Sequence, residues 1–237
     1  MEPGSCRAES GDFATAFPLN VEGENRFDFI ATDRAGNHVS TSLTVIRDTV
    51  PPHLQLVQPA EGLYTDEPTL PIDGNRLRPG GAAVSILANG VSVPVKEGRF
   101  KTIVALKEGE NALQLTATDA AGNVKTFSRK VILDTRPPKI TIDAPPNGRA
   151  LSTPAVILSG TVTDETAPIR FVTLNGNPVP VTRGAHLNFR SPLSPGANTF
   201  ILSATDTAGN TGITRWEVIF PSSVSPRQIL PLENNEN

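Results

Sequence analysis

TDRAGN at residues 32–37 returns as TDAAGN at 118–123 and again as TDTAGN at 205–210. The second copy begins 86 positions after the first, and the third begins 87 positions after the second. A long internal period of this kind indicates a chain built from repeated structural modules. The spacing therefore predicts domains of about 85 residues, near the lower end of the usual range, instead of one large domain.

The repeated hexad has the residues of a tight turn between two strands. Its Asp favours the first position of a type I turn, and its Gly, three residues later, can adopt a positive φ. The segment before each hexad alternates apolar and polar residues, as Phe27, Phe29 and Ala31 show in the first copy. A period of two with one apolar face is typical of a half-buried strand. We therefore expect each hexad to close a β-hairpin.

Composition and charge exclude several classes of protein. The 237 residues have a formal net charge of −3, which provides no basic field to attract nucleic acid. No run of 18 apolar residues occurs, so we expect no membrane span in this chain. The single cysteine, Cys6, cannot form an internal disulfide, which argues against a eukaryotic ectodomain and leaves a cytosolic or a bacterial surface protein open.

The turn motifs divide the chain into four segments. Short alternating runs recur within each period, and no apolar pattern of period 3.6 is long enough for a helix. About seven short strands in 85 residues are typical of an immunoglobulin-like sandwich. The expected segments are a partial module at 1–52, complete modules at 53–138 and 139–220, and a disordered tail at 221–237.

Five further motifs accompany the hexads. They are LSGTVTD at 158–164, VTLNG at 172–176, LSPGAN at 193–198, and the linkers DTVPP at 48–52 and DTRPP at 134–138. Together they resemble the bacterial immunoglobulin-like modules typified by domain B of glucodextranase. The resemblance covers residues from about 11 to 220, and it fails locally at DGNRLRPGG, residues 73–81. It implies an all-β fold of tandem immunoglobulin-like antiparallel β-sandwiches, the first of them incomplete.

The resemblance also implies a class of function. Such modules serve as spacers and stalks in secreted enzymes, adhesins and other surface proteins. We therefore expect a non-catalytic extracellular stalk or spacer of a larger bacterial surface or secreted protein. A role in adhesion is one form that this function could take. The expected location is secreted or on the cell surface, with the periplasm left open. Expected partners are other domains of the same parent protein, and then a surface polysaccharide or protein.

The alternative function is a carbohydrate-binding accessory region of a secreted glycoside hydrolase. Sugar binding on a β-sandwich usually uses a platform of exposed aromatic rings. Most Phe residues fall on the inward phase of the strands, so Tyr64 and Trp216 are the remaining candidates. They lie in different modules, which favours a packing role for both.

No residues with the pattern of a catalytic site were found. His38, His53 and His186 are far apart in sequence and occupy unrelated positions in the repeat. Nucleophile, P-loop, zinc-protease and paired-cysteine motifs are all missing from the sequence. The sequence therefore predicts that this chain is not an enzyme and has no cofactor other than, in one hypothesis, calcium.

The calcium hypothesis concerns the second junction between modules. In a tandem sandwich the hexad turn lies at the end where the chain enters, beside the preceding linker, and the loop after the second strand shares that end. This places Asp134 of the linker near Asp164, Glu165 and Asp206. Carboxylates and carbonyls are the ligands that calcium prefers. The competing interpretation is that the hexad Asp only forms its turn.

The first junction lacks the matching acidic residues. Asp48 and Asp119 occupy the linker and hexad positions there, but Arg76 and Arg78 stand where the other carboxylates would be. Guanidinium groups favour ion pairs over a bound cation. We therefore expect calcium at the second junction only, with Asp134, Asp164 and Asp206 as ligands.

The linkers and the first segment lead to two further expectations. Two consecutive prolines fix φ and keep the preceding residue extended, so the modules are expected to stand end to end in a rod.

Residues 1–52 have strands expected at 11–19, 25–32 and 38–47 but no facing sheet. We expect the natural chain to extend N-terminally by roughly 40 residues that supply it, because half a sandwich cannot bury its apolar face. The alternative is a strand donated by another protomer.

Overall fold

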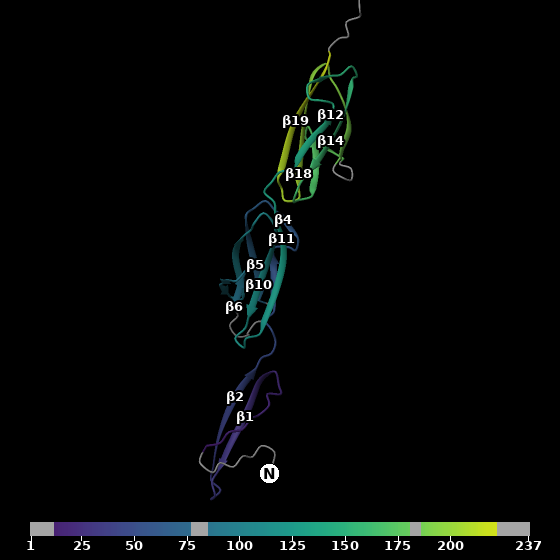
Figure 1. The fold of residues 1–237 in the computed structure, drawn as a ribbon. Coiled ribbons are helices and arrows are strands. Elements are labelled where there is room, and N and C mark those ends of the chain that lie inside the picture. The colour runs from purple at the N-terminus through teal and green to yellow at the C-terminus, as the bar shows by residue number, and fades with distance from the viewer. Residues whose placement is uncertain (1–11, 77–84, 181–185, 222–237) are drawn as a thin grey trace, which may run out of the picture. The chain divides into compact units, whose positions relative to one another are not determined.

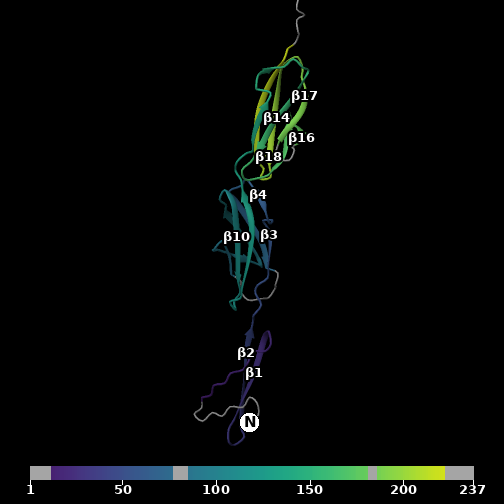
Figure 2. The same cartoon turned by 45° about the vertical axis from the view of Figure 1, so that its right-hand side comes forward.

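The computed structural model describes residues 12–76, 85–180 and 186–221. Every regular element among them is a β-strand, and none is a helix (Figures 1 and 2). Within these ranges there is therefore no helical segment long and apolar enough to cross a bilayer. The all-β prediction is confirmed. Contacts group the chain into two compact units, which are described separately: residues 1–55, 75–100 and 115–127, and residues 56–74, 101–114 and 128–237.

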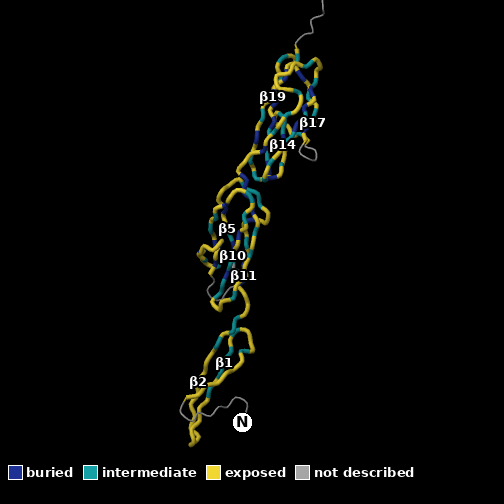
Figure 3. The backbone as a smooth tube through the Cα atoms, viewed as in Figure 1, coloured by how far each residue is buried: buried dark blue, intermediate teal, exposed yellow. Residues whose placement is uncertain are grey.

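The first unit begins with a long hairpin. Strands β1 (Gly23–Thr32) and β2 (His38–Arg47) pair antiparallel over their full length and form a two-stranded sheet. The first hexad closes this hairpin, as its sequence predicts. Every residue of both strands is exposed or half-buried, which Figure 3 shows as yellow and teal along the tube.

The strand expected at 11–19 is not formed within the described residues, because 12–20 contain no regular element. The prediction was wrong for a physical reason: a strand needs a neighbour to pair with, and Pro18 has no N–H to donate. Phe17 nevertheless stacks on Phe27, with ring centroids 5.2 Å apart. Phe17 remains 40% exposed and Leu43 53% exposed. The apolar face of the hairpin therefore has no facing sheet among the described residues, as expected.

The middle of the chain contributes two sheets. One has the strand order β4-β11-β10-β6-β7 and the other β3-β5-β9-β8. The strands are β3 (Leu54–Gln58), β4 (Leu63–Thr65), β5 (Thr69–Arg76), β6 (Ser85–Ala88), β7 (Val91–Val93), β8 (Val95–Lys96), β9 (Arg99–Ala105), β10 (Gly109–Thr118) and β11 (Val124–Leu133).

The chain changes sheets between two short strands of this region. The alternating residues Val91, Val93 and Val95 would suit one continuous strand, but β7 ends at Val93 and β8 begins at Val95, in the other sheet. Pro94 between them cannot donate a ladder hydrogen bond, so the chain changes sheets at this residue. Asn89 and Gly90 form the turn between β6 and β7, with φ of 47° and 82°, as an Asn-Gly pair between two strands favours.

The second unit contains the complete C-terminal sandwich. Its sheets have the orders β12-β14-β17 and β13-β19-β18-β15-β16. The two sheets face one another as layers in Figures 1 and 2. The strands are β12 (Lys139–Ala144), β13 (Arg149–Ala150), β14 (Ala155–Thr163), β15 (Ile169–Leu174), β16 (Asn177–Val179), β17 (His186–Pro192), β18 (Gly196–Asp206) and β19 (Thr211–Phe220).

The core of this sandwich follows from the alternation of apolar residues. Along β18, the side chains of Phe200, Leu202 and Ala204 are buried, while the residues between them face outward. Trp216 of the neighbouring strand is 8% exposed and belongs to the same core. At Gly160 of β14 the sheet packs so tightly that a Cβ would overlap the carbonyl oxygen of Thr141. That contact explains why glycine is needed there.

Two short strands pair in the parallel direction, which the sequence does not predict. Strand β4 pairs with β11, and β13 pairs with β19. In each case the chain crosses from one sheet to the other. Strands β3 and β12 belong to one sheet of their pair, and the strands that follow them, β4 and β13, are edge strands of the other sheet. All the other pairings recorded between the strands are antiparallel.

Candidate functional site

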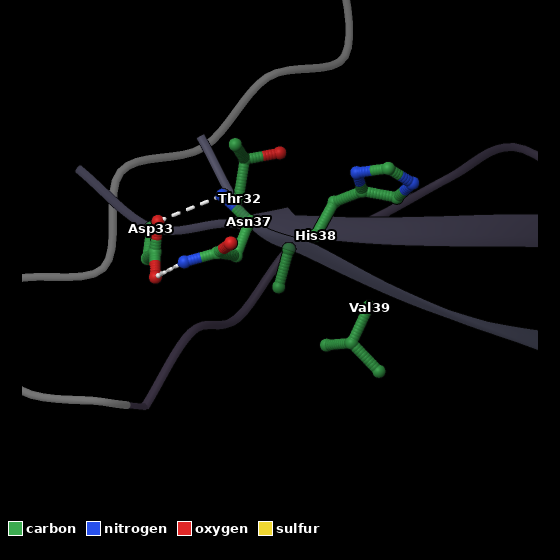
Figure 4. Close-up of a pocket in the computed structure, with 6 residues that line it drawn as sticks. Thr32, Asp33, Asn37, His38 and Val39 are labelled. Carbon is green, nitrogen blue, oxygen red and sulfur yellow. Dashed lines mark hydrogen bonds between the residues drawn. The ribbon is translucent and has the colours of Figure 1, made fainter. Parts of the chain in front are cut away.

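The hexad turn is held by its own Asp and Asn. Asp33 Oδ1 accepts hydrogen bonds from the backbone N–H groups of Ala35 (2.8 Å) and Asn37 (2.9 Å). The side-chain amide of Asn37 donates to Asp33 Oδ2 at 2.8 Å, and Figure 4 shows these two side chains turned toward one another. Gly36 has φ +89°. The Asn37 amide lowers the pKa of Asp33 most, with smaller contributions from backbone N–H groups. The prediction that the Asp forms the turn agrees with this geometry.

In the third hexad the Asn has a second bond, to the preceding linker. The side-chain amide of Asn210 donates to Asp206 Oδ2 at 3.0 Å and also to the backbone carbonyl oxygen of Asp134 at 2.8 Å. One amide group thus connects the turn of the module to the chain that enters it. Sequence reasoning missed this residue. The available signal was the Asn at the last position of all three hexads.

The second hexad has the same connection to its own linker. Asn123 donates to Asp119 Oδ2 at 3.0 Å and to the carbonyl oxygen of Asp48 at 3.1 Å. Burial of Asp119 raises its pKa, but the bonds from Asn123 and other N–H groups outweigh burial, and the net pKa is lowered. Arg76 lies in β5, and Arg78 lies outside the described residues. The expectation that Arg76 and Arg78 replace the carboxylates at this junction therefore stays a prediction.

The Thr of each linker is hydrogen-bonded to a Glu of the segment that precedes the linker. Glu108 accepts from Thr135, through the backbone N–H at 3.4 Å and through the hydroxyl at 3.0 Å. Glu22 accepts from Thr49 in the same way, at 2.7 Å and 3.0 Å. In the third module Pro195 replaces this Glu, and no DT-x-PP sequence follows in residues 221–237. Within this sequence, the Glu is thus present in the two repeats that are followed by a DT-x-PP linker and is replaced in the third.

The structure brings together the three carboxylates that the sequence predicts to meet. One carboxylate oxygen from each of Asp134, Asp164 and Asp206 lies within 4.8 Å of the others. Asp134 and Asp206 are 0% exposed, and Asp164 is half-buried. Asp164 Oδ1 accepts from the N–H groups of Thr166 and Ala167, both at 2.8 Å. We call these three residues the acidic triad.

Asp134 has a buried carboxylate oxygen without a hydrogen-bond partner among the described residues. Its Oδ1 accepts from the N–H of Arg136 at 3.1 Å, but its Oδ2 is buried and has no hydrogen-bond partner among the described residues. Burial raises the pKa of Asp134, and the charges of Asp164, Asp206 and Glu108 raise it further. A buried carboxylate that lacks a partner is costly unless something compensates its charge.

Glu165 does not join the triad. Its carboxylate forms an ion pair with Arg136 at 3.1 Å, and both side chains are largely exposed. The sequence placed Glu165 at the same junction, which is correct, but its role there is to pair with the linker arginine. This ion pair engages the guanidinium group of Arg136, which follows Asp134 by two residues.

The aromatic and histidine candidates lie elsewhere. Trp216 is buried and Tyr64 is half-buried in β4, so these two rings do not form an exposed sugar-binding platform. His38 begins β2 and is one of the residues that line a pocket at the first hexad, His53 precedes β3, and His186 begins β17. The three histidines thus lie in different parts of the fold, as their sequence positions suggest.

Comparison with known proteins gives the family of the modules. The model of glucodextranase domain B matches residues 52–135 and 138–219, which together are more than half of the chain. A bacterial immunoglobulin-like domain model matches residues 5–49.

One curated protein and several solved structures are similar to parts of this chain. Bacillopeptidase F of Bacillus subtilis (strain 168) is 32% identical over 141 residues, which are 56% of this chain and 9% of that protein. An I-band fragment of titin has a TM-score of 0.50 at 9% identity, and the match covers 73% of this chain and 66% of that one. Fibronectin(III)-like modules of Clostridium thermocellum CbhA have a TM-score of 0.45 at 11% identity, covering 71% and 94%. The chain belongs to the glucodextranase domain B family of bacterial immunoglobulin-like modules.

Proposed function

We propose that this chain is a non-catalytic spacer segment of a larger bacterial protein that acts outside the cell, after secretion or at the cell surface. Its modules occur in larger proteins, and the chain spans only 9% of the length of bacillopeptidase F. The partners proposed for it are the flanking domains of its own parent protein. The proposed modules are 1–52, 53–138 and 139–220, followed by the tail at 221–237.

The observation that carries this proposal is the double attachment of each linker. At the second junction, the Asn210 amide binds the linker at Asp134, and Glu108 binds it one residue later at Thr135. The following Pro137 and Pro138 have fixed φ angles. A linker that is hydrogen-bonded to the proposed modules before and after it, and restrained by prolines, resists bending, which suits a part that sets the spacing between other domains.

The carbohydrate-binding alternative has less support. It needs exposed rings gathered on one surface, and its two candidate residues are a buried Trp216 and a half-buried Tyr64. The junction residues that recur from one module to the next are turn formers and linker contacts, which are features of a spacer.

Small-angle X-ray scattering on the whole chain tests the proposal. A compact globule of this length would have a radius of gyration of roughly 18 Å. A spacer with restrained junctions should give a clearly larger value and a scattering curve that one extended conformation fits. The double variant Asn123→Ala, Asn210→Ala is the matched comparison and should require a mixture of bent conformations. A radius near that of the globule, or identical curves for both proteins, would refute the spacer.

A further inference from the structure

We propose that the acidic triad of Asp134, Asp164 and Asp206 binds one calcium ion, and that the ion connects the linker to the following module. This goes beyond the spacer function, because a spacer can be rigid without a metal. The inference rests on the geometry of the three carboxylates, on their burial, and on the unpaired oxygen of Asp134.

The geometry fits a calcium ion. Calcium binds oxygen ligands at about 2.3–2.6 Å, so two oxygens on one ion are separated by at most about 5 Å. The ligand oxygens of the triad all lie within 4.8 Å of one another. The group contains only oxygen donors, without histidine or cysteine, which favours a hard cation over zinc or copper.

Burial gives the second, independent reason. Asp134 is 0% exposed, and its Oδ2 has no partner among the described residues. Three carboxylates this close repel one another, and two of them are removed from water. A divalent cation removes the repulsion and supplies the missing partner in one step.

The carboxylates are already fixed in place by the backbone. Asp164 Oδ1 is held by two N–H groups of its own loop, and Asp206 Oδ1 by those of Gly209 (2.7 Å) and Asn210 (3.0 Å). Asp134 Oδ1 is held by the N–H of Arg136. The ligands therefore need little rearrangement to bind, which lowers the entropic cost of binding.

The surroundings of the triad are acidic. Glu108 acts on Asp134 through its charge, and the carboxylate of Asp66 approaches the hexad turn at Gly209. The nearby guanidinium of Arg136 pairs with Glu165. The local charge balance thus favours a cation.

The first junction provides a matched comparison within the same chain. Asp48 and Asp119 correspond to Asp134 and Asp206, but the repeat places Arg78 at the position of Asp164. Asp48 is half-buried, in contrast to the fully buried Asp134. Among the described residues, no second group of three ligating side chains comparable to the triad is found. The chain should therefore bind one calcium ion and not two.

Calorimetric titration of the whole, metal-depleted chain with calcium chloride tests the inference. The wild type should bind one ion per chain. Asp164→Asn keeps an oxygen acceptor for the loop N–H groups but removes a charge, and should weaken binding at least tenfold. Asp48→Asn, the matched control at the first junction, should bind as the wild type does. Asp134→Asn serves as a second variant if Asp164→Asn fails to fold.

Thermal unfolding followed by Trp216 fluorescence is the second readout. Without calcium, Asp164→Asn should unfold at a higher temperature than the wild type, because one repelling charge is gone. With calcium the order should reverse, and magnesium at the same concentration should shift the wild type less. No binding at about 10 mM calcium, well above the Kd of about 10⁻⁴–10⁻³ M typical of extracellular calcium modules, would overturn the inference. So would two sites per chain, equal weakening by Asp48→Asn, or equal shifts with both metals.

Discussion

Replacing the hexad asparagine at the second junction should destabilise the C-terminal module. Asn210→Ala removes the side-chain bonds to the Asp134 carbonyl (2.8 Å) and to the Asp206 carboxylate (3.0 Å). A bond to a neutral carbonyl contributes about 1 kcal/mol, and one to a carboxylate about 1.5–3 kcal/mol. Asn210 is half-buried, so the lower part of this range applies, and the expected loss is about 2 kcal/mol.

The unique tryptophan makes this loss measurable in one module. Trp216 is buried in the C-terminal core, and the chain contains no other Trp. Urea unfolding followed by its fluorescence therefore reports on residues 139–220. With a slope of about 1–3 kcal/mol per molar, a loss of this size moves the midpoint by about 1 M.

The control for this experiment is the same substitution at the other junction. Asn123→Ala removes the equivalent bonds to Asp119 and Asp48, and it should leave the Trp216 transition unchanged. If Asn210→Ala moves the midpoint by less than about 0.3 M, or if Asn123→Ala moves it equally, the hydrogen bonds of Asn210 do not stabilise the C-terminal module.

Two further substitutions test other parts of the account. Gly160→Ala should cost about 1–3 kcal/mol in the same Trp216 assay, because the added methyl overlaps the carbonyl oxygen of the adjacent strand; an unchanged midpoint would contradict that contact. Asp119 has a folded-state pKa below its ordinary 3.8, so its stabilising contribution is present above pH 3.8 and is lost as the pH falls through the lowered value. The protection factor of the Asn123 backbone amide, which is its exchange rate relative to that of an unstructured amide at the same pH, should therefore fall on acidification in the wild type and depend less on pH in Asp119→Asn. A parallel response of the two proteins would disprove the assignment.

Local features of this fold could be predicted from the sequence. The Asp and Gly of each hexad determine a tight turn through contacts within five residues, such as Asp33 to Asn37. Alternating apolar residues predicted β18 because one face of that strand is buried. The meeting of Asp134, Asp164 and Asp206 could also be predicted, since the repeat fixes which loops share one end of a sandwich.

Features that depend on distant partners could not be predicted. Asn210 is indistinguishable from an ordinary turn residue until the Asp134 carbonyl, 76 positions away, is placed beside it. The parallel pairing of β13 with β19 depends on where the chain changes sheets. Residues 12–20 have an apolar pattern suited to a strand but lack a neighbour to pair with. The period of the apolar residues shows which face of a strand is buried, but it contains no information on which other strand or residue will lie beside it.

The central proposal is that the hydrogen bonds of Asn210 to Asp134 and of Thr135 to Glu108, which reach the linker from the modules on its two sides, hold these modules in one orientation. Residual dipolar couplings of backbone amides in 53–138 and 139–220, measured on the weakly aligned whole chain, test it most directly. The account predicts that a single alignment tensor fits both modules in the wild type, and that Asn210→Ala requires two. Two tensors of different magnitude in the wild type would show that the modules reorient independently, and would contradict the claim.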